Sequence, residues 1–204
     1  MSKLIRMGAW LTTLGVFALL ASACGSEPGK SGTANSEPLV KTEPAKAPSD
    51  KGDSVVTGGD LAFMNDAAPG GMAEVELGRL ASKQAASKDV KAFAERMIAD
   101  HSKAGEELKA LAQQKKVMLP PDVLPKHKEA MAKLSKLNGA EFDKAYVMEM
   151  VAAHEKDVTA FEAQAKGSVD QDVKAFAEKT LPTLKMHLQM IRDMAAKMDV
   201  SAKP

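Results

Sequence analysis

Asp89-Val90-Lys91-Ala92-Phe93-Ala94-Glu95 is repeated, residue for residue, as Asp172-Val173-Lys174-Ala175-Phe176-Ala177-Glu178. In both copies Val and Phe are three residues apart, and apolar residues continue beyond them at three- and four-residue spacing, the periodicity of an amphipathic helix. Ser87 precedes the first copy as a helix-capping residue, and Gly167 closes the segment before the second copy. The repeat therefore predicts two similar helical hairpins.

Four long helices are predicted around this repeat. They cover about residues 61–86, 88–115, 140–166 and 170–199. Pro69, Gly70 and Gly71 predict a kink or a late start in the first helix, and Pro182 predicts a kink in the fourth. The alternation of apolar and polar residues that is typical of strands is absent from the sequence. The fold is therefore expected to be all α.

The connection between the two hairpins decides the topology. Residues 117–138 contain Pro120, Pro121 and Pro125, followed by a short amphipathic turn. An up-and-down bundle needs only a short loop at this point, whereas this connection is long enough to travel the length of a bundle. We therefore predict a ferritin-like four-helix bundle of two helical hairpins joined by a long crossover, occupying residues 61–199.

The composition excludes several classes of protein without naming an activity. The 204 residues are 45% hydrophobic and 27% charged, as in a soluble globular protein. The 28 Lys and Arg residues nearly balance the 27 Asp and Glu residues, so a broad basic surface is not expected. A nucleic-acid partner is therefore not predicted.

Residues 1–23 have the features of a secretory signal peptide. Lys3 and Arg6 precede an uncharged, largely apolar run over residues 7–23, which ends in Ala21, Ser22 and Ala23. The run is at the short limit for a membrane-spanning helix, and the small residues at its end suit a signal peptidase. We therefore predict that this segment directs export and is removed.

Cys24, the only cysteine, follows directly, and two interpretations compete. Ala-x-Ala is an ordinary secretory cleavage site, but a sole cysteine immediately after it resembles a bacterial lipobox. We favour lipidation of Cys24, because the unpaired thiol then has a purpose, and a membrane is the partner that this N-terminal lipid anchor implies. Gly25 and Ser26 lack the acidic residue that resembles an inner-membrane retention signal, which favours the periplasmic side of the outer membrane. Residues 24–60, rich in Gly, Pro, Ser, Thr, Lys and Glu, are expected to be a disordered tether.

Each predicted helix has one polar group near the middle of its apolar face. At 100° per residue, His101, His154 and His187 fall on the apolar stripes of the second, third and fourth helices, and Glu74 lies on the inner side of the first. Their distances from the helix ends agree to within about a turn. Because midpoints meet in either bundle topology, the four groups are expected to lie close together.

Three imidazoles and a carboxylate suit one divalent transition metal, which could be zinc, iron, copper, nickel or manganese. The first hypothesis is a metal or small-ligand site whose ligands are Glu74, His101, His154 and His187. The groups expected to hydrogen-bond these ligands are Asp143, Asp157 and Tyr146. The alternative is a structural or protein-interaction lipoprotein, in which Glu74, Asp143, Tyr146 or water satisfies the buried histidines in a polar core without a ligand.

A redox enzyme is the third hypothesis, and it has the least support. The paired Glu-x-x-His signature of di-iron enzymes needs Glu at positions where the chain has Ile98, Val151 and Leu184. A phosphate-binding loop and a nucleophilic triad are also absent from the sequence. Catalytic residues are therefore not predicted, and the non-enzymatic interpretations are favoured.

Several groups of residues occur in order and at consistent spacing over about residues 61–194. They are Gly70-Gly71-Met72-Ala73-Glu74-Val75-Glu76-Leu77-Gly78-Arg79-Leu80, residues 90–94, Met97 with Asp100-His101, Phe142-Asp143 with Tyr146, Met150 with His154, and Leu181-Pro182-Thr183-Leu184 with His187. Together they resemble the bacterial domain of unknown function family 4142. The resemblance implies a ferritin-like four-helix domain of an exported or outer-membrane-associated protein, with no settled activity.

Overall fold

The computed structural model describes residue 56 and residues 58–200. That part of the chain contains five α-helices: α1 (Gly58–Gln84), α2 (Lys88–Gln114), α3 (Pro125–Leu134), α4 (Gly139–Gly167) and α5 (Gln171–Lys197). The all-α prediction is confirmed, and the long helices end within a few residues of the expected positions. The predicted signal peptide, Cys24 and most of the predicted tether lie outside the described residues. None of the described helices has the length and hydrophobicity needed to cross a membrane.

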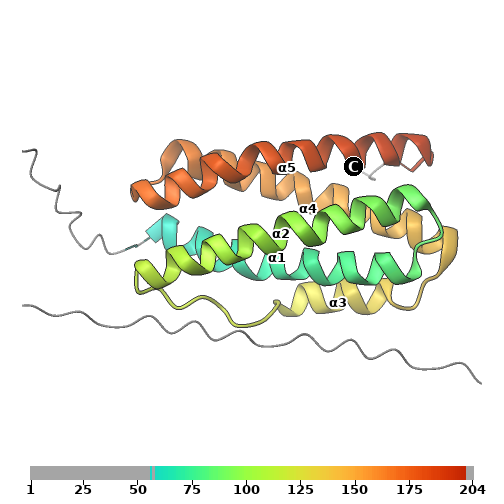
Figure 1. The fold of residues 1–204 in the computed structure, drawn as a ribbon, viewed down its shortest axis with the longest axis horizontal. Helices are drawn as coiled ribbons and strands as arrows, with labels where there is room; N and C mark the ends of the chain where they lie inside the picture. The colour runs from blue at the N-terminus through green and yellow to red at the C-terminus, as the bar shows by residue number, and fades with distance from the viewer. Residues whose placement is uncertain (1–55, 57, 201–204) are drawn as a thin grey trace, which may run out of the picture. The chain divides into compact units, whose positions relative to one another are not determined.

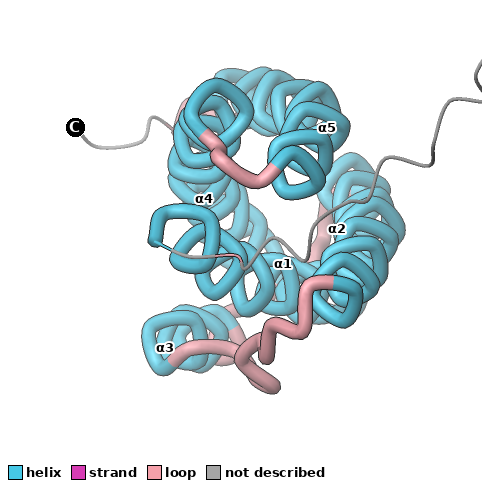
Figure 2. Tube along the Cα trace, turned by 90° about the vertical axis from the view of Figure 1, so that its left-hand side faces the viewer, coloured by secondary structure: helices cyan, strands magenta, loops and turns pink. Residues whose placement is uncertain are grey.

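Two antiparallel hairpins, α1–α2 and α4–α5, pack side by side, with α1 against α4 and α2 against α5 (Figure 1). Seen end-on, these four helices surround a common centre, and α3 lies outside them next to α1 (Figure 2). The connection that contains α3 carries the chain back along the bundle, so α4 starts at the end where α1 finishes. This is the crossover of the predicted ferritin-like arrangement, and the short amphipathic turn expected within it is a helix of 10 residues.

Two buried aspartates join the hairpins reciprocally at opposite ends of the bundle. Near the start of α4, Asp143 accepts hydrogen bonds from the backbone N–H groups of Ala86 (3.1 Å) and Ser87 (2.8 Å) in the α1–α2 turn. Near the start of α1, Asp60 accepts two backbone N–H groups of the α4–α5 turn, at 3.1 and 2.8 Å. The interval between Asp60 and Asp143 equals that between the two copies of the repeated heptapeptide. The two hairpins therefore use equivalent residues to hold each other's turns.

The start of α1 differs from the prediction. The helix begins at Gly58 rather than near residue 61, and it continues through Pro69, so the predicted late start is wrong. The reason is tertiary, because Asp60 accepts hydrogen bonds from two backbone N–H groups of the α4–α5 turn, and these bonds hold the first turn of α1 in place. The first helix of the bundle therefore begins three residues before the predicted start of the domain at residue 61.

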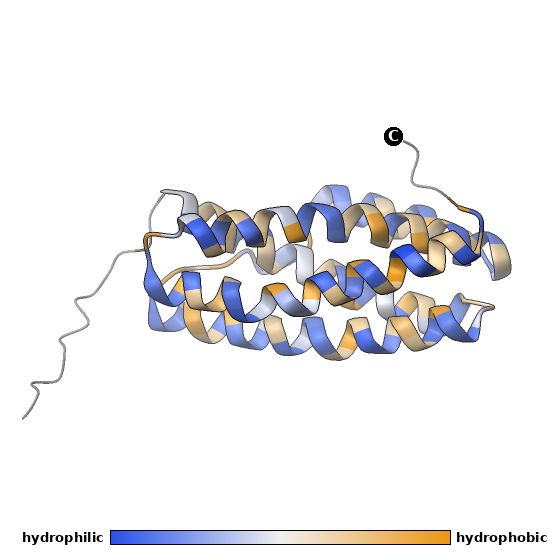
Figure 3. Ribbon diagram, turned by 90° about the horizontal axis from the view of Figure 1, so that it is seen from above, coloured by the Kyte–Doolittle hydropathy of each residue, from blue (hydrophilic) through white to orange (hydrophobic). Residues whose placement is uncertain are grey.

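A polar layer at mid-bundle divides the hydrophobic core into two parts. One part is built around Phe93, Phe142 and Tyr146, and the other around Phe63, Phe161 and Phe176. The buried polar residues that lie between them along the helices are Glu74, His101, His154 and His187. Hydrophilic and hydrophobic residues alternate along the helices, as expected where each helix buries one face (Figure 3).

Gly78 allows α1 and α2 to approach each other closely. A Cβ atom at this position would lie 2.9 Å from Cγ1 of Ile98 and 3.0 Å from the backbone oxygen of Ala94. Gly70, in the same helix, would meet nothing within 4 Å of its Cβ. The two glycines therefore form a matched pair, one at a tight contact and one beside open space.

Gly78→Ala is expected to destabilise the domain by about 1–3 kcal/mol, because α2 must shift to admit the methyl group. Gly70→Ala is expected to stabilise the domain by up to about 1 kcal/mol, because alanine is the better helix former. Chemical denaturation of both variants measures the two changes in the free energy of unfolding. Equal changes at the two positions would contradict the close approach of the helices.

Candidate metal centre

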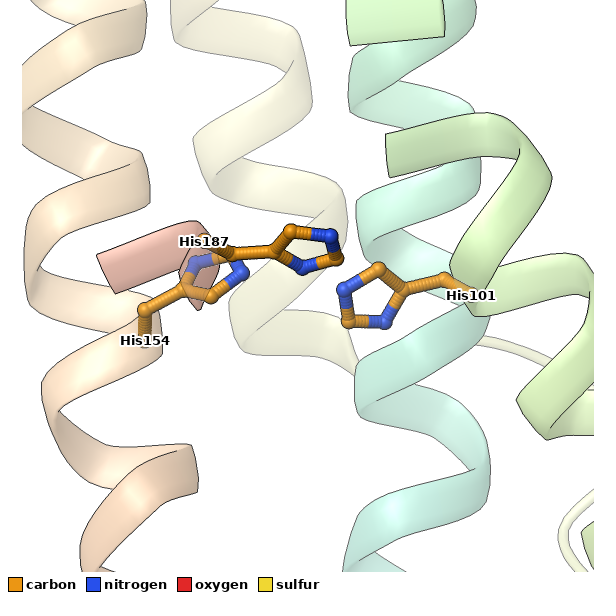
Figure 4. Close-up of side chains that lie close together, drawn as sticks. All are labelled: His101, His154 and His187. Atoms are coloured by element: carbon orange, nitrogen blue, oxygen red, sulfur yellow. The ribbon is translucent and has the colours of Figure 1, made fainter. Parts of the chain in front are cut away.

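The polar layer brings together three histidines from three helices. His101 lies on α2, His154 on α4 and His187 on α5, and their side chains point toward one another between the helices (Figure 4). His154 and His187 are fully buried, at 0% exposure, and His101 is 7% exposed. Their mid-helix positions on inner faces place the three rings at one level of the bundle.

The three rings form a nearly equilateral triangle. Their centroids are 5.6 Å apart for His101 and His154, 5.4 Å for His101 and His187, and 5.5 Å for His154 and His187. One nitrogen of each ring lies within 4.8 Å of a nitrogen of each of the other two. Three imidazoles that bind one metal ion at about 2.1 Å have ring centroids about 5.3–5.5 Å apart. The ring centroids are therefore spaced as around a single ion, and small side-chain shifts would bring the nitrogens to the separation of about 3.4 Å that tetrahedral binding requires.

One nitrogen of each ring is already hydrogen-bonded to an acceptor. Nδ1 of His101 is 2.9 Å from Oε2 of Glu74, and Nδ1 of His154 is 2.9 Å from the backbone oxygen one turn earlier in α4. Nε2 of His187 is 2.8 Å from Oδ2 of Asp100. Because all three partners are acceptors, each of these nitrogens donates a proton, and a neutral ring keeps a lone pair on its other nitrogen.

The other nitrogen of each ring has no hydrogen-bond partner among the described residues. These buried atoms are Nε2 of His101, Nε2 of His154 and Nδ1 of His187. Burial lowers the pKa of all three imidazoles and outweighs the nearby carboxylates, and the pKa of His101 falls to about 4. The three rings are therefore neutral near pH 7, which is the form in which imidazole binds a metal ion.

Glu74 lies on the Nδ1 side of two of the rings. Its Oε2 accepts from His101, and its Oε1 is 3.5 Å from Nδ1 of His154. Glu74, which the sequence places among the ligands, is therefore positioned to orient the ring of His101, whereas its Oε1 has no hydrogen-bond partner among the described residues. Asp157 lies beside it, and burial together with the charge of Glu74 raises the pKa of Asp157 to about 8. These two carboxyl groups therefore hold a proton near neutral pH.

The other two predicted hydrogen-bonding partners have different surroundings. The carboxylate of Asp143 accepts hydrogen bonds from backbone N–H groups of the α1–α2 turn, and so it is not a partner of a histidine. Tyr146 packs against Phe142 and Phe93, at ring-centroid distances of 5.8 and 6.5 Å. Its buried hydroxyl has no hydrogen-bond partner among the described residues, and burial raises its pKa. Tyr146 is thus a core residue next to the polar layer.

Asp100 orients His187 and is not among the site residues predicted from the sequence. It precedes His101 directly, and the rotation of 100° per residue along α2 turns it toward α5, where it meets His187. The Asp-His pair is visible in the sequence. Which histidine the aspartate serves depends on how α2 packs against α5, and the sequence does not show this packing.

The sequence matches a family described as "Domain of unknown function (DUF4142)" over residues 45–194. The chain belongs to the DUF4142 family. The matched region includes all three histidines of the cluster together with Glu74, Asp100 and Asp157. No curated protein matches the chain. Membership of DUF4142 therefore confirms the family resemblance seen in the sequence motifs and names no activity.

Solved structures share the fold of this DUF4142 protein at low sequence identity. A DUF305 protein from Streptomyces coelicolor is 14% identical, with a TM-score of 0.62, over 72% of this chain and 96% of that chain. A DUF305 fragment from Deinococcus radiodurans is 12% identical, with a TM-score of 0.63, over 71% and 99%. CopM in its Cu(I)-bound form is 14% identical, with a TM-score of 0.59, over 69% and 98%. At these identities the similarity establishes the fold alone.

The titration of His101 is expected to reduce the stability of the metal-free protein as the pH falls. The pKa of His101 is lowered from 6.5 to about 4 in the folded state, so between these pH values the unfolded chain binds a proton at this residue that the folded chain does not. The contribution of His101 to the free energy of unfolding therefore falls as the pH decreases through this range, while the raised pKa of Asp157 acts in the opposite direction and is common to wild type and variant. His101→Gln keeps an N–H donor for Glu74 but removes the titrating imidazole. Lowering the pH from 6.5 to about 4 should therefore reduce the stability of this variant less than that of the wild type. Thermal unfolding against pH tests this, and parallel curves would contradict a neutral, buried His101.

Proposed function

We propose that this DUF4142 domain binds one transition-metal ion through His101, His154 and His187. The observation that carries the proposal is the convergence of three buried ring nitrogens that have no proton and no described partner. A single metal ion accepts all three lone pairs at once. The opposite nitrogen of each ring already donates to an acceptor, as is usual for histidines that bind metals.

The charges around the three rings also favour a cation. The carboxylates of Glu74 and Asp100 bond two of the rings, and Asp157 supplies a further carboxyl group beside Glu74. Hydrophobic residues pack above and below this layer, and the ring of Phe93 lies 6.3 Å from His154 and 6.2 Å from His187. In surroundings this apolar, the attraction between a metal ion and the carboxylates is stronger than in water.

Copper is the first metal to test. Imidazole suits copper, zinc, iron and nickel, and divalent copper is usually the most tightly bound of these ions. CopM, which shares the fold, has solved structures in a Cu(I)-bound and a Cu(II)-bound form. The three-histidine set of this chain would supply the protein ligands, and the ion would serve as a bound Lewis acid or redox centre.

The metal-free protein is expected to bind one Cu(II) ion per chain more tightly than one Zn(II) ion, and either ion should raise the melting temperature. His154→Gln should remove or strongly weaken binding, because it takes away one of three ligands. His127→Gln is the matched control, since His127 lies on α3 outside the cluster. Calorimetric titration and thermal unfolding measure these effects. Failure of the wild type to bind copper, zinc, iron(II) or manganese would eliminate the site and leave the histidines as a polar core.

Asp100→Ala tests the orienting hydrogen bond separately. The variant is expected to bind one ion per chain with affinity weakened about 10- to 100-fold, because the ring of His187 loses its acceptor. The same titration measures both quantities. An unchanged affinity would show that Asp100 does not support a metal ligand.

We also propose that the domain is a lipoprotein held on the periplasmic side of the bacterial outer membrane. The support is the order of features at the N-terminus: Lys3 and Arg6, an apolar run to residue 23, and the only cysteine immediately after it. The structural relative from Streptomyces coelicolor is described as a candidate secreted protein, which agrees with export. Acylation of Cys24 would anchor residues 24–57 and the bundle that follows to the membrane.

Cys24→Ser is expected to abolish the incorporation of labelled fatty acid and to move the protein from the membrane fraction to the soluble fraction, because the acyl chains supply the membrane affinity. The helical content measured by circular dichroism should not change, since Cys24 precedes the first helix of the bundle in the sequence by more than 30 residues. Labelling that persists in the variant would refute the lipoprotein assignment.

A further inference from the structure

A groove on one side of the bundle reaches the histidine cluster. It is lined by α1, α2, α3 and the connection between α2 and α3, and its volume is about 1000 Å³. His101 forms part of its wall, whereas the fully buried His154 and His187 do not. The groove therefore approaches the cluster at one of the three proposed ligands.

A small inner cavity continues from this groove into the bundle. Its volume is about 40 Å³, which is enough for a water molecule or a metal ion, and Glu74 and Asp157 are among its walls. Ala68, Gly71, His101 and Gly105 line both the groove and the cavity. Two glycines, one alanine and one proposed ligand therefore form the boundary between the two spaces.

The two glycines contribute no side chain to this boundary. A Cβ atom at Gly71 would lie 3.9 Å from Nδ1 of His101, and a Cβ atom at Gly105 would meet nothing within 4 Å. Gly105 is one turn after His101 on the same face of α2, so a side chain there would cover the approach to the ring. Glycine inside a helix costs about 1 kcal/mol relative to alanine. The need to keep a passage open would explain why glycine, rather than a better helix former, occupies both positions.

We infer that the metal ion reaches and leaves the histidine cluster through this passage, with Gly71 and Gly105 at its narrowest point. The inference rests on the metal site proposed above. Nε2 of His101 is buried and has no described partner, and His101 is the only one of the three histidines that lines the groove. His101 is therefore the first ligand that an arriving ion meets, and His154 and His187 complete the site from deeper in the bundle.

A second groove provides the control. It lies between α1, α3 and α4 and has a volume of about 640 Å³. It also borders the small cavity, through Ala67, Glu74, Asp157 and Phe161, but none of the three clustered histidines lines it. Gly70 lines this groove, and a Cβ atom there would also meet nothing within 4 Å. A larger side chain at Gly70 therefore narrows a comparable groove and leaves the proposed passage open.

Gly105→Leu in the full-length protein is expected to slow both the uptake of Cu(II) and its removal by a chelator about tenfold or more. The dissociation constant should stay at the wild-type value, because a narrower passage raises the same barrier in both directions. Stopped-flow kinetics and calorimetry measure the rates and the affinity. Gly70→Leu should leave both rates unchanged. Gly105→Ala and Gly105→Val complete a graded series in which both rates should fall as the side chain grows. Alanine favours the helix, so the Gly105→Ala variant is expected to fold.

The possible outcomes separate this inference from the proposed function. Wild-type rates in Gly105→Leu, or equal slowing in Gly70→Leu, would overturn the passage and leave the metal site standing. A changed affinity with unchanged uptake would also overturn it, because the glycine would then act on the bound state. If the wild type binds no Cu(II), the proposed metal site itself fails.

Discussion

The buried carboxylate of Glu74 is the constraint around which the middle of the bundle is arranged. A carboxylate in an apolar interior is costly unless hydrogen-bond donors or a positive charge compensate for the lost water. Oε2 of Glu74 accepts from Nδ1 of His101 in its own hairpin at 2.9 Å, and Asp157 of the other hairpin forms a hydrogen bond with the same carboxyl group. A shift of one hairpin along the other would leave this carboxylate without part of its compensation. The polar layer therefore selects one register for the packing of the two hairpins.

The two ends of the bundle enforce the same register. Asp60 and Asp143 each bind backbone N–H groups in the turn of the opposite hairpin, so a slide of either hairpin breaks hydrogen bonds at both ends. The three histidines thus sit on long helices whose relative positions are held at both ends and in the middle. Histidine side chains on such a scaffold need little reorganisation to bind an ion, so ordering them reduces the affinity less.

Several buried polar atoms of the metal-free layer have no hydrogen-bond partner among the described residues. Three of these atoms are ring nitrogens, and burial together with the charge of Glu74 raises the pKa of Asp157 to about 8. Most buried polar groups in proteins are hydrogen-bonded, and exceptions concentrate at functional sites. A purely structural polar core would need ordered water to satisfy the three nitrogens. A metal ion satisfies them together and also offsets the negative charge of the carboxylates.

The sequence by itself determined the four long helices, their pairing into hairpins and the crossover, because periodicity, capping residues and connection length are local properties of the chain. It also placed His101, His154 and His187 on inner faces at similar depth, since the rotation along a helix is fixed. Tertiary structure alone decided that α1 begins at Gly58, that Asp143 holds a turn, and that Asp100 serves His187. It also decided which nitrogen of each ring is left without a partner. These features depend on the rotation and axial offset of helices from different hairpins, and only the packing of the whole bundle sets those.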